Sequence, residues 1–204
     1  MHIAIEGPIG AGKTTLARQL AAYLRQQTRE TVRLSLENYQ RNAFLADFYA
    51  DPERWALPAQ LDFLVSRHRQ LEALTPAAGT ITVADHTLLK DRIFAELVLK
   101  GRELALYREI ADAMPAGGSQ PTLIVYLDAD TPTLLTRIAE RGRDFEAAIT
   151  AEYLSDLHRL YRDHLATLHV PVLAVEASRV EPGSPAQLTA LWQHICRAHQ
   201  RAPD

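Results

Sequence analysis

The sequence predicts an α/β fold in which helices flank a five-stranded parallel sheet. Two observations predict it. Five short apolar segments alternate along the chain with longer segments of helical periodicity, and that alternation is typical of a parallel sheet. A glycine-rich turn at residues 7–14 joins the first strand segment to the first helical segment and matches the phosphate-binding P-loop. We therefore expect a three-layer fold of the P-loop type, with its site at the carboxyl ends of the strands.

Each predicted strand is a short, mainly apolar segment. They span residues 2–5, 31–36, 80–84, 122–127 and 171–175. The fourth is continuously apolar, which indicates burial on both faces. The second strand ends at Glu37 and the third at Asp85, so two carboxylates and the P-loop meet at one edge of the sheet.

The predicted helices follow the spacing of their apolar residues. They span residues 13–27, 42–49, 52–74, 88–100, 103–114, 131–140, 150–168 and 185–199. The first carries Leu16, Leu20 and Leu24 on one face. Asp51 and Pro52 predict the start of the long third helix, because proline is favoured in a first helical turn.

Glycine and proline mark the expected interruptions. Pro58 lies inside the third helix and predicts a kink or a break. Gly101 is expected to hinge the fourth and fifth helices, and residues 116–119 to form a loop. Pro132 favours the start of the sixth helix. The tail at 201–204 is expected to fray.

Length and composition are those of one soluble globular domain spanning residues 1–204. The net charge of −3, with no basic tract, argues against a nucleic-acid binder. One cysteine, Cys196, excludes an internal disulfide and a cysteine zinc cluster. No apolar run reaches the length of a membrane span and no leader pattern precedes the first strand, so we expect a cytoplasmic protein without a membrane partner.

The P-loop predicts binding of a nucleoside triphosphate. Its glycines let backbone N–H groups converge on phosphate oxygens, and the helix N-terminus adds positive potential. Lys13 can reach the β- and γ-phosphates, and the hydroxyl of Thr14 can ligate Mg²⁺. A chance match is the alternative, which the strand–helix context disfavours. The expected ATP-binding residues are Gly7, Pro8, Ile9, Gly10, Ala11, Gly12, Lys13, Thr14 and Thr15.

The two carboxylates at the strand ends have expected roles in phosphoryl transfer. Asp85 is placed to hold Mg²⁺ with Thr14, directly or through water, or to cap the next helix. Glu37 is placed to accept a proton from an attacking hydroxyl, or to be a solvated residue at a strand end.

Arg137, Arg141 and Arg143 form a basic run around Gly142. Behind a P-loop, this run predicts a short arginine-rich lid that brings guanidinium groups to the phosphates. A helix that ends in solvated charge is the alternative. Gln60 lies in the third helix, where its amide can pair with the edge of a nucleobase or take a packing role.

In order along the chain, these motifs resemble the deoxyribonucleoside kinase family, over residues 3 to about 165. Residues 5–15 resemble its P-loop, and Glu37 falls at its catalytic carboxylate. Tyr49 matches the tyrosine that packs on the deoxyribose and meets its 3′-hydroxyl. Residues 137–146 resemble the lid. The resemblance implies transfer of the γ-phosphoryl group of ATP, with Mg²⁺, to the 5′-hydroxyl of a 2′-deoxynucleoside in nucleotide salvage.

The resemblance also implies how the reactants are held. Gln60 and Arg67, seven residues apart, match the family's base-reading pair. Asp91 matches the acid that pairs with this arginine, and Glu146 the contact to the sugar. Members with such an ion pair use cytosine or purine bases, which argues against thymidine. Short bacterial-looking members whose P-loop reads Gly-Pro-Ile-Gly-Ala-Gly-Lys, as residues 7–13 do here, often use deoxyadenosine or deoxyguanosine, so the resemblance implies a purine. Lys13, Arg137, Arg141 and Arg143 would carry the transition-state charge while Glu37 takes the proton. The family is commonly dimeric, so we expect a homodimer.

One departure concerns the segment after the third strand. The family usually has an arginine there, near the 5′-oxygen, where this chain has His86. Histidine is shorter and can be neutral at pH 7. Lys90 follows four residues later, and the two would share a face if the segment from His86 to Lys90 is helical. We hypothesise that Lys90 restores the missing charge; a solvated lysine is the alternative.

Two other functions remain open at this point. A nucleoside-monophosphate kinase, such as a thymidylate kinase, shares the P-loop and lid but needs cations for the phosphate of its acceptor. A non-catalytic nucleotide-binding subunit exists within the family, and His86 is compatible with that role. The intact Lys13, Thr14, Glu37 and Asp85 argue against it.

Overall fold

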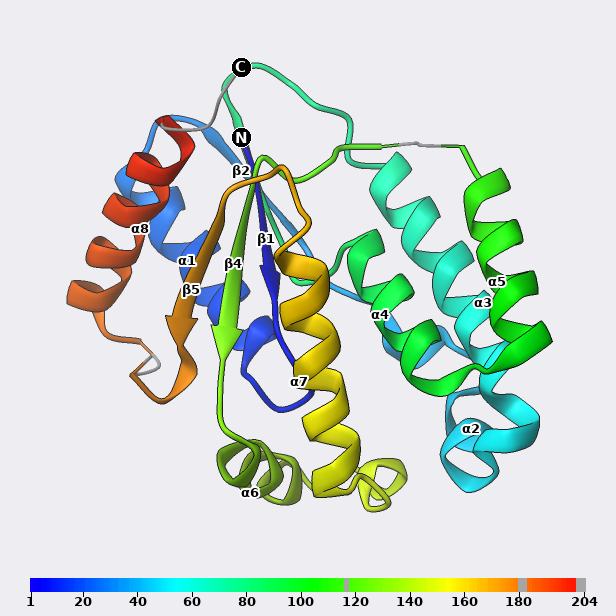
Figure 1. Cartoon of the computed structure of the whole chain (residues 1–204). Helices are drawn as coiled ribbons and strands as arrows, with labels where there is room; N and C mark the ends of the chain where they lie inside the picture. The colour runs from blue at the N-terminus through cyan, green and yellow to red at the C-terminus, as the bar shows by residue number, and fades with distance from the viewer. Residues whose placement is uncertain (116–117, 180–182, 201–204) are drawn as a thin grey trace.

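The computed structural model describes residues 1–115, 118–179 and 183–200. The predicted tail at 201–204 and the first half of the predicted loop at 116–119 lie outside these residues. Five parallel strands form a sheet in the order β2-β3-β1-β4-β5, and β1, β4 and β5 are easily followed in Figure 1. The strands are β1 (His2–Glu6), β2 (Thr31–Ser35), β3 (Thr80–Ala84), β4 (Leu123–Asp128) and β5 (Val172–Glu176). The predicted α/β fold is confirmed.

The helices lie within a few residues of their predicted bounds, with one exception. They are α1 (Lys13–Gln27), α2 (Leu45–Ala50), α3 (Pro52–Glu72), α4 (Leu88–Val98), α5 (Gly101–Ala113), α6 (Thr131–Arg141), α7 (Ala151–Leu165) and α8 (Pro185–Gln200). Short 3-10 turns are η1 (Tyr39–Arg41), η2 (Asp144–Glu146) and η3 (Ala177–Arg179). None of the described helices combines the length and the apolar character needed to cross a membrane.

The exception is the helix predicted at 42–49: η1 ends just before this range, and the helix α2 begins only at Leu45. Asn42 lies between them and is buried. Its Oδ1 accepts a hydrogen bond from the backbone N–H of Phe44 at 3.0 Å, and its Nδ2 donates to the carbonyl of Ala59 at 3.0 Å. An asparagine that bonds the backbone two residues ahead stabilises a turn rather than a helix.

The break predicted at Pro58 is not formed, and α3 is continuous. Ala56 and Ala59, on either side of the proline, are buried in one apolar cluster with Phe48 and Tyr107. Packing on both sides of Pro58 therefore offsets the loss of one backbone hydrogen bond.

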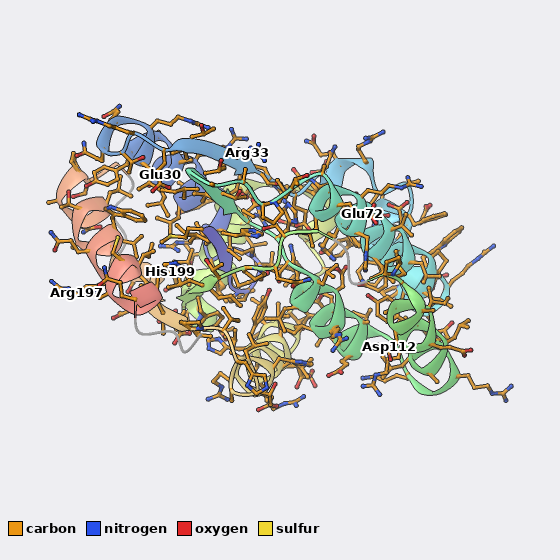
Figure 2. The ribbon with its side chains drawn as sticks, turned by 90° about the horizontal axis from the view of Figure 1, so that it is seen from above. Glu30, Arg33, Glu72, Asp112, Arg197 and His199 are labelled. Atoms are coloured by element: carbon orange, nitrogen blue, oxygen red, sulfur yellow. The ribbon has the colours of Figure 1, made fainter. Side chains whose placement is uncertain are left out.

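Helices cover both faces of the sheet, as the view from above in Figure 2 shows. On one face Ile3 and Ile5 of β1 pack against Leu16 of α1, in the main core that also includes residues of α8. On the other face Tyr126 of β4 packs against Tyr161 of α7 in a cluster that includes α4. Alternate residues of a strand point to opposite faces, so the central strands are buried on both sides and only their ends are free to carry a site.

The first glycine of the P-loop is set by a close approach to β4. Gly7 has a φ of 148°, and a Cβ added to it would lie 2.6 Å from the carbonyl oxygen of Leu127. Gly7→Ala is expected to lower the free energy of unfolding by about 1–3 kcal/mol, measured by urea denaturation. Gly79→Ala is the control, because Gly79 also has a positive φ, of 68°, but nothing lies within 4 Å of its added Cβ. Equal losses in the two variants would contradict the clash with Leu127.

Candidate active site

A cavity of about 460 Å³ opens at the carboxyl edge of the sheet. The side chains labelled in Figure 2, Glu30 and Arg33 among them, lie at the opposite edge. The cavity is bounded by the P-loop, the segment after β2, helices α2, α3 and α4, and the segment between α6 and α7. The predicted site residues that line it are Ile9, Gly10, Gly12, Lys13, Thr14, Thr15, Glu37, Tyr49, Gln60, Arg67, Asp85, Arg141, Arg143 and Glu146.

The glycines of the P-loop are followed directly by Lys13, the first residue of helix α1. Gly12, with a φ of 95°, precedes the helix and lets the loop turn into it. The ammonium of Lys13 donates to the carbonyl oxygens of Gly7 at 2.7 Å and Pro8 at 2.8 Å. Burial, and then the nearby charge of Lys90, lower the pKa of Lys13 to about 7. An anionic group bound at the loop would favour the charged ammonium and raise this pKa, as expected of a phosphate site.

Asp85 joins the P-loop helix to the end of β2. Its Oδ2 accepts a hydrogen bond from the hydroxyl of Thr14 at 2.5 Å, and its Oδ1 accepts one from the backbone N–H of Glu37 at 2.6 Å. Helix α4 is capped by Thr87, so the alternative role of Asp85 as its cap is wrong. A hydroxyl and a carboxylate are ligands that Mg²⁺ takes together with phosphate and water. The pair therefore fits a magnesium site.

Two cations hold the carboxylate of Glu37. Arg67 donates to its Oε1 through Nε at 2.7 Å and through a terminal nitrogen, and the ammonium of Lys90 donates to its Oε2. The side chain is 12% exposed, so the solvated alternative is wrong. Burial by itself would raise the pKa of Glu37, but Arg67 and Lys90 outweigh it and hold the pKa well below its ordinary value. Glu37 is therefore ionised at neutral pH.

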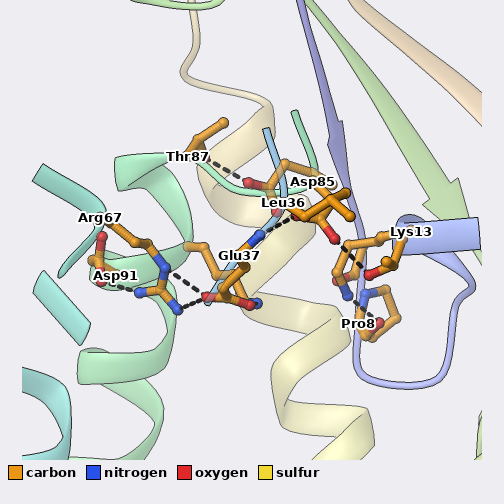
Figure 3. A network of polar contacts seen from close by, with 12 residues as sticks. Pro8, Lys13, Leu36, Glu37, Arg67, Asp85, Thr87 and Asp91 are labelled. Atoms are coloured by element: carbon orange, nitrogen blue, oxygen red, sulfur yellow. Dashed lines mark hydrogen bonds and ion pairs between the residues drawn. The ribbon is translucent and has the colours of Figure 1, made fainter. Parts of the chain in front are cut away.

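Figure 3 shows Arg67 between Glu37 and Asp91. The guanidinium of Arg67 pairs with Oδ1 of Asp91, the pairing expected from the sequence. It also lies 4.7 Å from the ring of Phe63, one helical turn away on α3. Burial raises the pKa of Asp91 to about 6, although the charge of Arg67 opposes the shift. Asp91 does not itself line the cavity, but it contacts the lining residue Arg67.

Gln60 and Tyr49 offer neutral polar groups to the cavity. Gln60 is 2% exposed, and its Oε1 has no hydrogen-bond partner within the described chain. Leaving a buried acceptor unpaired costs about 1–3 kcal/mol, so this oxygen fits a donor on a bound base. The ring of Tyr49 packs 5.4 Å from that of Phe145. Burial, and then the charge of Glu146, raise the pKa of Tyr49, so its hydroxyl stays protonated.

The segment after α6 carries two arginines that share one acid. Arg141 donates through Nε to Oε2 of Glu146 at 3.1 Å, and Arg143 donates to its Oε1 at 3.1 Å. The guanidinium of Arg143 also lies 4.2 Å from the ring of Tyr39 on η1, across the cavity. Gly142 lies between the arginines with a φ of 63° and ends α6. Both arginines thus line the cavity and pair with one carboxylate, although each remains partly exposed to solvent.

Six predicted site residues do not line the cavity: Gly7, Pro8, Ala11, His86, Asp91 and Arg137. Arg137 donates to the carbonyls of Ala11 at 3.3 Å and Ala177 at 3.1 Å, which ties the P-loop to the end of β5. His86 is fully buried and pairs with the hydroxyl of Ser35 at 2.9 Å. Burial lowers the pKa of His86 to about 4, so this histidine is neutral at pH 7.

Apart from Tyr49, the aromatic side chains that line the cavity were not predicted from the sequence. Phe63 follows Gln60 by three residues and Phe94 follows Lys90 by four, so helical spacing would have placed both at the site. Tyr39 lies in the loop directly after β2, at the edge where the site was expected. Its contact with Arg143 joins positions 104 residues apart (143 minus 39), and no local pattern carries that information.

The comparisons with known proteins agree with this geometry. A family model described as deoxynucleoside kinase matches residues 3–197. A deoxyguanosine kinase of Bacillus subtilis (strain 168) is 37% identical over 158 residues, which cover 76% of this chain and 73% of the relative. A deoxyadenosine kinase of Dictyostelium discoideum is 34% identical over 196 residues, which cover 92% of this chain and 77% of the relative.

The fold also has a counterpart among solved structures. A deoxyadenosine kinase from M. mycoides, solved with the products dCMP and a flexible dCDP bound, superposes with a TM-score of 0.81 at 23% identity. The match covers 97% of this chain and 99% of that one. The family match and the two sequence relatives span most of the chain. The chain therefore belongs to the deoxynucleoside kinase family and is an ATP-dependent phosphotransferase.

Proposed function

We propose that this kinase transfers the γ-phosphoryl group of ATP to the 5′-hydroxyl of a purine 2′-deoxynucleoside, deoxyguanosine or deoxyadenosine, in nucleotide salvage. One observation carries the proposal: a single cavity joins Lys13 of the P-loop to the carboxylate of Glu37 and the polar groups of Gln60 and Arg67. We assign Lys13 and Glu37 to phosphoryl transfer and Gln60 and Arg67 to reading the base. The purine preference is supported by relatives that are a deoxyguanosine kinase and a deoxyadenosine kinase.

The proposed chemistry begins with Glu37, which accepts the proton of the 5′-hydroxyl as its oxygen attacks the γ-phosphorus. Thr14 and Asp85 would hold Mg²⁺, which neutralises charge on the β- and γ-phosphates when bound. Lys13 contacts these phosphates from the loop.

The proposed lid extends from α6 through η2. Arg141 and Arg143 turn toward the transferring group as the lid closes on the cavity. Arg137, predicted from the sequence to contact phosphate, is instead proposed to position the P-loop through its bond to the carbonyl of Ala11.

For the acceptor, the ring of Tyr49 is proposed to pack on the deoxyribose and leave little room for a 2′-hydroxyl, while Glu146 binds the sugar. Gln60 and the Arg67–Asp91 pair read the base. The unpaired Oε1 of Gln60 supplies an acceptor for the base edge, and the guanidinium of Arg67, held by Asp91, supplies donors.

The base-reading pair predicts a change of specificity. Replacing Arg67 by Met and Asp91 by Leu together should raise the kcat/KM ratio of thymidine to deoxyguanosine by at least about tenfold, because buried groups that reject thymidine are removed. Each single change should mainly weaken binding, because it leaves a buried charge without its partner. Steady-state kinetics with both nucleosides measures the ratio. Equal tolerance of the two single changes would show that the residues are not paired in function.

The nucleoside-monophosphate kinase is disfavoured by the charge balance at the acceptor end. The cations there, Arg67 and Lys90, are both paired with the acids Glu37 and Asp91, so they offer little to a second phosphate. A panel of the four deoxynucleosides and their monophosphates with ATP and Mg²⁺ tests the proposal. We expect deoxyguanosine or deoxyadenosine to give the highest kcat/KM. Faster phosphorylation of a monophosphate, or no product at all, would contradict it.

We also propose that residues 1–204 form one kinase domain that acts as a cytoplasmic homodimer. The family match over residues 3–197 supports the single domain, and the resemblance to commonly dimeric kinases supports the homodimer. Light scattering of the purified chain measures the oligomeric state.

A further inference from the structure

Lys90 is a buried cation inside the cavity. It lies on the first turn of α4, and its side chain is 10% exposed. Its ammonium pairs with Oε2 of Glu37 and lies 5.6 Å from the ring centroid of Phe94. A solvated lysine, the alternative left open by the sequence, is therefore wrong. An ammonium out of water is costly unless it is paired, so the ion pair with Glu37 accounts for its retention in the fold.

The charges around Glu37 are balanced only while its carboxylate is ionised. Two cations, Arg67 and Lys90, face two anions, Glu37 and Asp91. Arg67 has a second acid in Asp91, whereas Lys90 is described with Glu37 alone as its ion-pair partner. When Glu37 takes a proton, Arg67 keeps Asp91 as its ion-pair partner. The buried Glu6 interacts electrostatically with Lys90, but no ion pair between the two is found among the described residues. The charge released by that proton transfer is thus concentrated on Lys90.

His86 and Lys13, the other basic groups near Glu37, cannot replace Lys90 as its freed cation. His86, at the end of β3, is neutral, turned toward Ser35 and outside the cavity lining. Lys13 is bound to the carbonyls of the P-loop, on the side of the phosphate donor. The charge of Lys90 nonetheless reaches the P-loop, since it is the largest electrostatic influence on Lys13. Lys90 therefore lines the same cavity as the candidate base Glu37 and the P-loop lysine Lys13.

We propose that Lys90 is a catalytic residue that pairs with Glu37 before reaction and contacts an oxygen of the transferring phosphoryl group during it. The inference rests on the proposed function. The bond from the 5′-oxygen to the γ-phosphorus forms, and the bond from that phosphorus to the β–γ bridging oxygen breaks, with its electron pair leaving on ADP. The 5′-hydroxyl proton passes to Glu37. Lys90, freed from its partner, then stabilises the charge on the phosphoryl oxygens.

The test compares Lys90→Met with Lys100→Met. The chain has three lysines, and Lys100 is an exposed one at the start of α5. Removing one charge-stabilising donor typically costs about 10²–10³ in kcat, and that loss is expected for Lys90→Met. The dissociation constant of deoxyguanosine, measured by direct binding, should change less than tenfold. Lys100→Met should match the wild type, and Lys90→Arg, which keeps the charge, should recover at least tenfold of the lost turnover.

A second readout separates catalysis from folding. Thermal denaturation of the wild type, Lys90→Met and Lys90→Arg is recorded under the assay conditions. We expect Lys90→Met to stay folded at the assay temperature and still to lose about 10²–10³ in kcat, which loss of stability alone would not produce.

Failure of the proposal for Lys90 and failure of the proposed function give different results. If the wild type phosphorylates deoxyguanosine and Lys90→Met does so at the same rate, Lys90 has no catalytic role. Equal kcat values for Lys90→Arg and Lys90→Met, both far below the wild type, would show that charge is not what matters there. A wild type without activity on any deoxynucleoside overturns the proposed function itself, and the role of Lys90 with it.

Discussion

Replacing Glu37 by Gln is expected to lower kcat by about 10²–10⁴ while the chain stays folded, the range typical of a lost general base. Glutamine keeps the shape of the side chain but cannot accept the proton of the 5′-hydroxyl. Glu37 is held as a carboxylate by Arg67 and Lys90, so it is ready to accept and orient that proton at neutral pH. Because little covalent chemistry falls to the protein in phosphoryl transfer, this orientation is a large share of its contribution.

The measurement is steady-state kinetics with deoxyguanosine, accompanied by thermal denaturation. Glu30→Gln is the matched control, since Glu30 is an exposed glutamate at the opposite edge of the sheet, visible in Figure 2. Near-wild-type turnover in Glu37→Gln would remove Glu37 from the mechanism. A drop in kcat that is matched by Glu30→Gln would do the same.

Replacing Arg143 by Ala is expected to cut kcat by on the order of 10³, within the range of about 10³–10⁵ found for arginines supplied to related sites. The affinity for deoxyguanosine should change less than tenfold. Arg143 lines the cavity, follows Gly142 at the end of α6, and contacts both Glu146 and Tyr39. Closure of this segment over bound substrates would exclude water and direct the guanidinium to the γ-phosphate.

Arg143→Lys should recover only part of the lost turnover, because an ammonium copies neither the two-pronged contact with phosphate nor the stacking on Tyr39. Arg102→Ala, on the exposed surface of α5, is the control and should behave as the wild type. Steady-state kinetics combined with direct nucleoside binding separates the two effects. Normal turnover in Arg143→Ala would exclude this segment as a catalytic lid.

Local sequence patterns were sufficient to predict most of the fold and the residues at the centre of the site. The P-loop glycines and the carboxylates after β2 and β3 could be placed from the sequence, because strands and helices have their own periods and parallel strands end at one edge. The turn at Asn42 could not, since its buried side chain bonds Ala59, seventeen residues away.

The finer arrangement of the site depends on contacts between distant segments. The pairing of Glu37 with both Arg67 and Lys90 joins three elements, and only the folded chain shows that one carboxylate serves two cations. The orientation of the His86 side chain is likewise set by its hydrogen bond with Ser35, which lies on the neighbouring strand β2. Arg137, which the basic run assigned to phosphate, is held by the carbonyls of Ala11 and Ala177. Such tertiary partners override what spacing within one segment predicts.

The proposed reaction is tested most directly by identifying which hydroxyl of the deoxynucleoside receives the phosphoryl group. The wild type is incubated with deoxyguanosine, ATP and Mg²⁺, and the products are followed by ³¹P NMR with proton coupling. We predict a new phosphomonoester signal split by the pair of 5′ protons of the sugar, growing as ADP forms in equal amount. A signal split by the single 3′ proton, or release of inorganic phosphate without a monoester, would contradict the placement of the 5′-hydroxyl between Glu37 and the P-loop.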